Sequence, residues 1–194
     1  LGGGRVEVDG EIHEAKKIIL ATGSVPKALP GLETDGVRVL NSDHILDLQE
    51  VPQHLVILGA GAIGVEFASV FARLGSKVTL VEFMDRILPI EDASVGEELA
   101  KLLTKLHKMD IRVKTKITSI ERHDDKVVCH LEGDKGGVVE GTHLLVAVGR
   151  GPVTANVGLE ATAAKVDRGF VEIDAMMRTT EPNLYAIGDI VKTP

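Results

Sequence analysis

Several features that would place a protein in a particular class are scarce in this chain of 194 residues. Its one cysteine cannot form a disulfide within the chain and is typical of a reducing compartment, so we expect a cytoplasmic protein. No apolar run approaches the roughly 20 residues that span a bilayer, and the first residues lack the regions of a signal peptide. The net charge of −7, without a cluster of Lys or Arg, argues against binding to nucleic acid.

The cysteine itself, Cys129, lies in a segment of alternating residues at 126–131. This pattern favours packing inside a strand over a reactive thiol, because no activating motif lies nearby. The remaining composition is that of an ordinary globular chain, with 44% hydrophobic and 26% charged residues. The length suffices for one large domain or two small ones.

The most informative segment is a glycine-rich turn between an apolar strand and a helix. We expect the strand at 54–58, the helix at 62–74 and a second strand at 77–81, which Glu82 follows directly. The turn reads Gly59, Ala60, Gly61, Ala62, Ile63 and Gly64. A strand, a GxGxxG turn, a helix, a strand and a terminal acid together form the fingerprint of a dinucleotide-binding unit.

Each part of this fingerprint has a physical role. Gly59 permits the tight turn, Gly61 leaves space for a pyrophosphate to approach the backbone, and Gly64 lets the helix pack closely on the strand. The N–H groups at the start of the helix then face the phosphates, and Glu82 can accept both hydroxyls of an adenine ribose. The alternative is a plain glycine turn in a βαβ unit that binds nothing.

Further strands and one more helix surround this unit. Residues 41–149 form the coherent domain, with a second helix starting near 91–92, a three-stranded meander at 115–140 and a strand at 144–148. The second helix is expected to bury an apolar face of Leu99, Leu102, Leu103 and Leu106. These patterns predict an α/β fold, a Rossmann-like parallel sheet with a three-stranded antiparallel meander inserted before its last strand.

The segments on either side of this domain are shorter. Asp9-Gly10 is a hairpin signal between 5–8 and 11–13, and 17–21 reads as a buried strand. A short strand pair is expected around 171–173. Another strand is expected before Asp189.

Three motifs lie at the carboxyl ends of expected strands in and next to these regions. They are Ala21-Thr22-Gly23-Ser24, Val148-Gly149-Arg150 and Tyr185-Ala186-Ile187-Gly188-Asp189. In this order around a GxGxxG unit they strongly resemble the flavin-dependent pyridine nucleotide–disulfide oxidoreductases, over nearly the whole chain. Ala62 occupies the position where glutathione reductase-like members carry a tyrosine, and this favours the dihydrolipoamide dehydrogenase branch.

The resemblance implies a domain organisation and a set of cofactor contacts. In that family the NAD domain is inserted into the FAD domain, so 1–40 and 150–194 would be partial FAD-domain segments around an NAD-binding domain at 41–149. On the NAD side, the turn 59–64 and Glu66 would wrap the pyrophosphate and nicotinamide, Glu82 would hold the adenine ribose, Ile117 would line the adenine end and Gly149 would approach the nicotinamide. On the FAD side, the matching positions are Thr22, Gly23, Ser24 and Asp189.

Glu66 has two interpretations. It stands one helical turn into the phosphate-binding helix, where a solvated or capping glutamate would be ordinary. The resemblance instead places it beside the nicotinamide, paired with a lysine that would lie upstream of this sequence.

The sequence also departs from the family. The GxGxxG for FAD, the CxxxxC redox disulfide and the C-terminal interface domain with its His–Glu pair are missing. We therefore expect the NAD(H)-binding portion of an FAD-dependent dihydrolipoamide dehydrogenase, inactive alone, with no catalytic residue or metal ligand of its own. The parent would oxidise dihydrolipoamide with NAD⁺ and is expected to be a homodimer, with a 2-oxo acid dehydrogenase complex as a candidate assembly. The alternatives are another disulfide or mercuric reductase of the family and a non-catalytic NAD-sensing module.

Overall fold

The computed structural model describes residues 2–192 and divides into two compact units. The first, which we call the central unit, is Pro26–Gly149. The second, the flanking unit, combines the chain up to Val25 with the chain from Arg150 onward. Within residues 2–192, no helix is long and apolar enough to cross a membrane.

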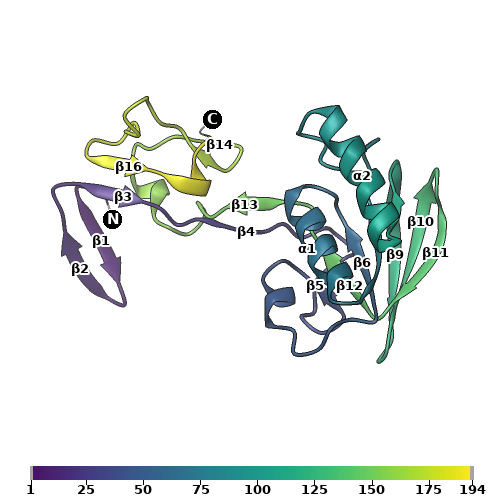
Figure 1. The fold of residues 1–194 in the computed structure, drawn as a ribbon. Coiled ribbons are helices and arrows are strands. Elements are labelled where there is room, and N and C mark those ends of the chain that lie inside the picture. The colour runs from purple at the N-terminus through teal and green to yellow at the C-terminus, as the bar shows by residue number, and fades with distance from the viewer. Residues whose placement is uncertain (1, 193–194) are drawn as a thin grey trace. The chain divides into compact units, whose positions relative to one another are not determined.

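A five-stranded sheet of order β5-β12-β6-β7-β8 forms the middle of the central unit (Figure 1). All neighbouring pairs in this sheet are parallel. The strands are β5 (Val39–Leu40), β6 (His54–Leu58), β7 (Lys77–Val81), β8 (Asp110–Arg112) and β12 (His143–Val146). In the observed register, Ile57 of β6 lies between Leu80 of β7 and Leu145 of β12. The predicted parallel sheet is therefore present, and β6, β7 and β12 lie within two residues of their expected bounds.

Side chains of β6 alternate between two hydrophobic clusters because successive residues of a strand point to opposite faces. Leu55 and Ile57 belong to one cluster, and Val56 and Leu58 belong to the other. Both faces of the sheet are thus covered, which is why its strands read as continuous apolar runs rather than as alternating ones.

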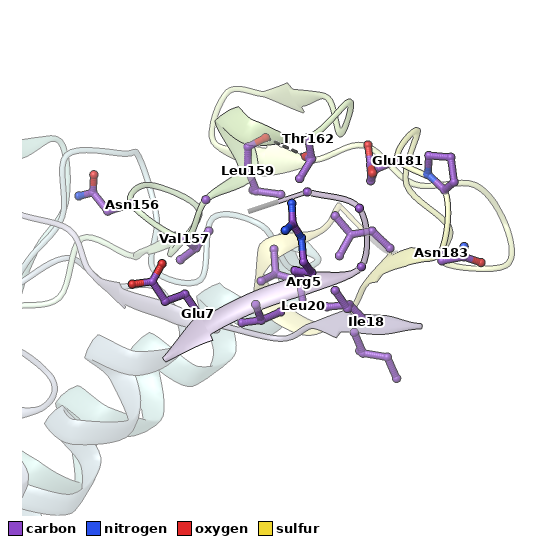
Figure 2. Close-up of a pocket in the computed structure, with 18 of the residues that line it drawn as sticks. Arg5, Glu7, Ile18, Leu20, Asn156, Val157, Leu159, Thr162, Glu181 and Asn183 are labelled. Atoms are coloured by element: carbon purple, nitrogen blue, oxygen red, sulfur yellow. Dashed lines mark hydrogen bonds between the residues drawn. The ribbon is translucent and has the colours of Figure 1, made fainter. Parts of the chain in front are cut away.

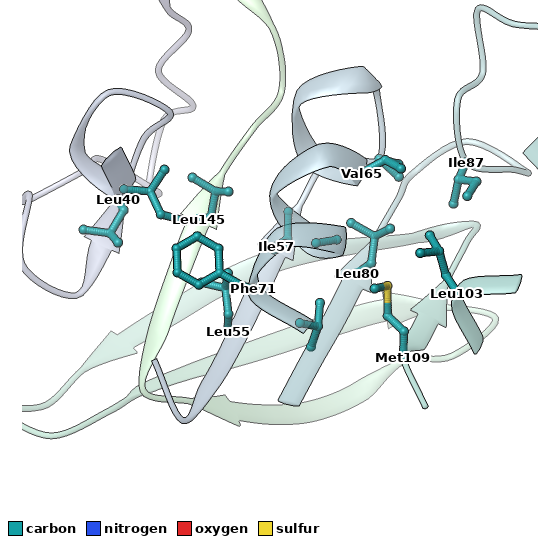
Figure 3. Close-up of a cluster of buried hydrophobic side chains, with 14 residues drawn as sticks. Leu40, Leu55, Ile57, Val65, Phe71, Leu80, Ile87, Leu103, Met109 and Leu145 are labelled. Atoms are coloured by element: carbon teal, nitrogen blue, oxygen red, sulfur yellow. The ribbon is translucent and has the colours of Figure 1, made fainter. Parts of the chain in front are cut away.

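Helices α1 (Ala62–Arg73) and α2 (Ala93–His107) contribute to the first cluster. Figure 3 shows Val65 and Phe71 of α1 against the β6 and β7 side chains, with Leu103 of α2 beside them. A short 3₁₀-helix, η1 (His44–Asp47), precedes β6. Helix α1 ends as expected, with Gly75 in the left-handed region at a φ of 102°.

The expected apolar face of α2 is wrong in part. Leu103 is 4% exposed and Leu99 is partly buried, but Leu102 is 43% and Leu106 is 67% exposed. The helix packs at the β8 edge of the sheet, where a short strand offers only a narrow surface. The sequence spacing predicts the helix, but it does not predict how much of the apolar face of the helix is covered by other elements.

The predicted three-stranded meander covers the other face of the sheet. Its strands are β9 (Thr115–Arg122), β10 (Val127–Gly133) and β11 (Gly137–Gly141), antiparallel in the order β11-β10-β9. Cys129 is fully buried in the second cluster, and burial raises the pKa of its thiol to about 12. The prediction that this cysteine serves packing is confirmed by its position among the buried apolar residues of this cluster.

The flanking unit consists of short elements. Its strands are β1 (Arg5–Val8), β2 (Glu11–Glu14), β3 (Ile18–Leu20), β4 (Ser24–Pro26), β13 (Arg150–Pro152), β14 (Val166–Asp167), β15 (Phe170–Val171) and β16 (Leu184–Ala186), and its 3₁₀-helices are η2 (Leu159–Ala161) and η3 (Gly188–Ile190). The pairs are β1–β2, β13–β4, β14–β15 and β16–β3. Asp9 and Gly10 both have positive φ, at 51° and 83°, which confirms the predicted hairpin.

The buried strand expected at 17–21 is present as β3, but only one of its faces, with Ile18 and Leu20, is partly buried. Ile19 is 64% exposed, and β16 is its only partner strand among residues 2–192. Successive side chains of a strand point to opposite faces, so Ile18 and Leu20 pack against the hydrophobic cluster of this unit, whereas Ile19 points to the other, uncovered face.

Candidate dinucleotide-binding site

The glycine turn lies at the carboxyl end of β6 and opens directly into α1. The Gly59 N–H donates to the Val81 carbonyl at 2.8 Å, which ties the turn to the end of the neighbouring strand β7. Ligands of open α/β sheets bind outside the carboxyl ends of the strands. The turn therefore occupies the edge of the sheet where a ligand is expected.

The three glycines of the turn occupy different environments. Gly59 has a φ of 101°, and a Cβ there would lie 2.5 Å from the Ala147 carbonyl oxygen. A Cβ on Gly64 would overlap the Gly59 carbonyl oxygen. A Cβ on Gly61 would meet no atom within 4 Å. Two of the glycines are thus required by the protein's own packing, whereas the space at Gly61 is left open.

The first turn of α1 presents backbone donors to this open space. The first N–H groups of a helix have no partner within the helix, and the N-cap residue, Gly61, has no side chain to satisfy them. Ala62 and Glu66 are both exposed on this helix. An anion at this position would gain unpaired N–H donors and the positive end of the helix dipole.

Glu82 lies beside the turn, and its carboxylate is held by the backbone. The residue is 8% exposed. Its Oε2 accepts a hydrogen bond from the Ala60 N–H at 2.7 Å, and its Oε1 accepts one from the Met84 N–H at 2.8 Å. Sequence reasoning placed the residue correctly at the end of β7 but missed both hydrogen bonds, because nothing in the residue pattern indicates them.

The other two residues expected on the NAD side differ in exposure. Gly149, just beyond β12, is exposed with a φ of 106°. Ile117 is 8% exposed and belongs to the hydrophobic cluster beneath the meander. The strand that carries Ile117 starts beside Glu82, since the Thr115 N–H donates to the Glu82 carbonyl at 3.0 Å. The structure brings the turn, Glu82 and the start of β9 together, but only a small part of Ile117 faces outward.

The residues expected on the FAD side meet within the flanking unit. The Ser24 hydroxyl donates to Asp189 Oδ2 at 2.6 Å, and the Thr22 hydroxyl donates to the Val153 carbonyl at 2.5 Å. Gly23 has a φ of 73°, and its carbonyl accepts the Val153 N–H at 2.8 Å. Three strand ends that are far apart in sequence thus converge on one place.

Arg150 joins this group, and no role was predicted for it. Its Nε donates to the Ser24 hydroxyl oxygen at 2.9 Å, and its Nη2 donates to the Ser24 carbonyl at 2.6 Å. The only sequence signal was its place after Gly149 in a quoted motif. Ser24 is therefore held between a guanidinium and the Asp189 carboxylate.

A cavity of about 600 Å³ lies in the flanking unit but contains none of the predicted site residues. Figure 2 shows Ile18 and Leu20 of β3 and Leu159 of η2 among the residues that line it, together with the charged Arg5 and Glu181. Its lining is mainly apolar, and strand β3 forms part of it.

A family model described as pyridine nucleotide-disulphide oxidoreductase matches residues 2–194. The chain belongs to the pyridine nucleotide–disulphide oxidoreductase family. The family membership predicted from the sequence motifs is thus confirmed.

Individual members of the family are similar over nearly the whole chain. The dihydrolipoyl dehydrogenase of Chlorobaculum tepidum is 40% identical over 186 residues, which cover 94% of this chain and 39% of that protein. The dihydrolipoyl dehydrogenase of Thermus scotoductus is 41% identical over 194 residues, which cover 97% of this chain and 42% of that protein. The chain therefore spans about two fifths of the length of these relatives.

Solved structures of the family show the same fold. LpdA from Mycobacterium tuberculosis has a TM-score of 0.86 at 32% identity, over 98% of this chain and 42% of that one. The HOCl-induced flavoprotein disulfide reductase RclA from Escherichia coli has a TM-score of 0.84 at 36% identity, over 96% of this chain and 42% of that one. The mixed α/β architecture is thus that of the flavoprotein disulfide reductases.

Proposed function

We propose that this chain is the NAD(H)-binding portion of a flavin-dependent dihydrolipoamide dehydrogenase. The observation that carries the proposal is the open space at Gly61, next to the unpaired N–H groups that start α1. The family membership and the dihydrolipoyl dehydrogenase relatives support this proposal. The reaction that we propose for the complete protein is the oxidation of dihydrolipoamide by NAD⁺, which gives lipoamide and NADH.

On the NAD side, the chain's own residues would bind and orient the dinucleotide. The pyrophosphate fits against Gly61, where an added side chain would have room and a phosphate therefore has room too. Glu82 lies at the end of β7, the position from which an acid reaches the adenine ribose. The nicotinamide would extend toward the exposed Glu66 and Gly149, with Ile117 at the adenine end.

On the FAD side, the residues present fit only part of a flavin. Asp189 is exposed and uses Oδ2 to accept the Ser24 hydroxyl, so its carboxylate is positioned to accept further hydrogen bonds from flavin hydroxyls. Thr22 and Gly23 would complete this contact. When both cofactors are bound, they carry the electron transfer, and the protein supplies position and charge.

We further propose that the complete protein is a homodimer and a component of a 2-oxo acid dehydrogenase complex. The names of the dihydrolipoyl dehydrogenase relatives support the second part of this proposal. The isolated chain is expected to bind NADH without catalysing the reaction.

Calorimetric titration with NADH tests the site. In a Gly61→Val variant, the side chain would occupy the space that the pyrophosphate needs, so binding is expected to disappear while circular dichroism stays that of the wild type. Ser119→Val is the matched control, because it adds a valine at an exposed position of the meander strand β9. Retained affinity in a folded Gly61→Val variant would refute the phosphate-binding role of the turn.

A further inference from the structure

The peptide groups of Ala60 are fixed on both sides before any cofactor binds. Its N–H donates to Glu82 Oε2 at 2.7 Å, and its carbonyl accepts the Leu88 N–H at 2.8 Å. The residue is fully buried, with 0% of its surface exposed. Ala60, although it lies inside the GxGxxG turn, therefore has no donor to offer a phosphate.

Glu82 is fixed just as firmly. Its backbone N–H donates to the Arg112 carbonyl at 2.8 Å, and its carbonyl accepts the Thr115 N–H at 3.0 Å. Its second carboxylate oxygen accepts the Met84 N–H at 2.8 Å. A buried carboxylate is tolerated when hydrogen bonds satisfy it, and here two backbone donors do so. The side chain is thus a rigid bridge between the segment after β7 and the glycine turn.

We infer that Glu82 is a positioning residue in the cofactor-free protein. Its carboxylate accepts the Ala60 N–H, a contact that we call the clasp, and this contact sets the shape of the glycine turn. The same group would then both arrange the phosphate-binding backbone and accept the adenine ribose. The cofactor part of this inference rests on the proposed function, whereas the clasp itself does not.

The clasp changes what a substitution at this position should do. If Glu82 only accepted ribose hydroxyls, its loss would weaken NADH and leave NADPH unaffected or improved. If it also shapes the turn, its loss leaves the Ala60 N–H buried without its charged acceptor, and the turn loses its fixed geometry. Both cofactors should then bind more weakly, because both present the same pyrophosphate.

Amide hydrogen exchange in the cofactor-free protein tests the clasp directly. Glu82→Gln keeps the size of the side chain but removes its charge, and a hydrogen bond to a charged group is strong enough that the Ala60 amide should exchange at least roughly tenfold faster. Amides at the centre of β6 and β7 should keep their wild-type rates. Glu97→Gln, at an exposed position of α2, is the matched control and should change neither set.

Titration of the same variants with NADH and with NADPH supplies the second readout. Both affinities are expected to fall at least roughly tenfold in Glu82→Gln and to stay at wild-type values in Glu97→Gln. Unchanged exchange at Ala60 would overturn the clasp whether or not the chain binds a cofactor. Faster exchange at Ala60 in a chain that binds neither cofactor would uphold the clasp and refute the proposed function.

If Glu82→Gln fails to fold, Glu82→Asp takes its place in the exchange measurement. It keeps the charge but is one methylene shorter, so it cannot hold both N–H groups at their present distances of 2.7 and 2.8 Å. Faster exchange at Ala60 or Met84 in this variant supports the clasp, and wild-type rates at both amides overturn it.

Discussion

Gly64→Ala is expected to destabilise the central unit, although alanine is the better helix former. The added Cβ would overlap the Gly59 carbonyl oxygen, and a backbone atom cannot rotate away as the end of a side chain can. Gly59 has little freedom to retreat, because its N–H is bonded to Val81 at 2.8 Å and its Cα faces the Ala147 carbonyl. Helix α1 and strand β6 must therefore separate locally.

The magnitude follows from two opposing effects. Inserting an atom into a well-packed site costs about 1–3 kcal/mol, and the rigid backbone neighbour places this case at the upper end. Replacing glycine by alanine inside a helix recovers about 1 kcal/mol. We expect a net loss of about 2 kcal/mol in the free energy of unfolding.

Urea unfolding followed by the helical circular dichroism signal measures this loss, because both α-helices belong to the central unit. Gly61→Ala is the matched control. It adds the same methyl group three residues earlier and meets no atom within 4 Å, so its cost should be limited to the loss of a favourable N-cap residue, about 1 kcal/mol or less. A Gly64→Ala protein as stable as the wild type, or more stable, would show that helix propensity wins and that the close approach of α1 to β6 does not constrain this residue.

Three further predictions concern cofactors and pH. The chain should prefer NADH to NADPH at least roughly tenfold, because the 2′-phosphate of NADPH would lie against the Glu82 carboxylate. The nearby cation, Arg86, already contacts the Pro89 carbonyl at 3.2 Å and Asp85 at 3.5 Å. Equal affinities for the two cofactors in competitive titrations would refute this prediction. The purified chain should be colourless and show no lipoamide-dependent NADH turnover, since it lacks a GxGxxG for FAD and a CxxxxC pair; stoichiometric bound flavin in an absorption spectrum would contradict the first part. Stability should fall as the pH drops below about 6.5, the unfolded histidine pKa, because burial lowers the pKa of His54 and of His143 and the unfolded chain then binds more protons. Urea midpoints between pH 8 and pH 5 measure this, and a His54→Asn, His143→Asn double variant should show a flatter profile over that range.

The sheet and its turn were predictable from sequence because several independent signals agree there. In β6, an apolar run, a following glycine turn and a downstream helical pattern all require the same assignment. The meander was predictable for a similar reason, since turn residues separate its strands. Hydrophobic periodicity reports that a residue is suited to burial, but the partner that buries it lies elsewhere in the chain. Ile19 and Leu106 have the same apolar character as Ile57, yet they are exposed because no neighbouring element covers them.

In the candidate site, too, local features could be predicted from the sequence, whereas long-range contacts could not. A glycine's freedom is a property of one residue, so the separate roles of Gly59, Gly61 and Gly64 can be inferred from their spacing. The two hydrogen bonds of the Glu82 carboxylate and the contact of Arg150 with Ser24 depend on which groups long-range packing brings together. No local sequence pattern encodes those partners. Glu82 shows the consequence most clearly. Its sequence position predicts a ligand for ribose, but its burial and its two backbone donors make it part of the glycine turn, although it lies 22 residues after Ala60. A selectivity experiment that removes Glu82 therefore measures a change in the turn together with a change in ribose recognition, and only a measurement on the cofactor-free protein separates the two.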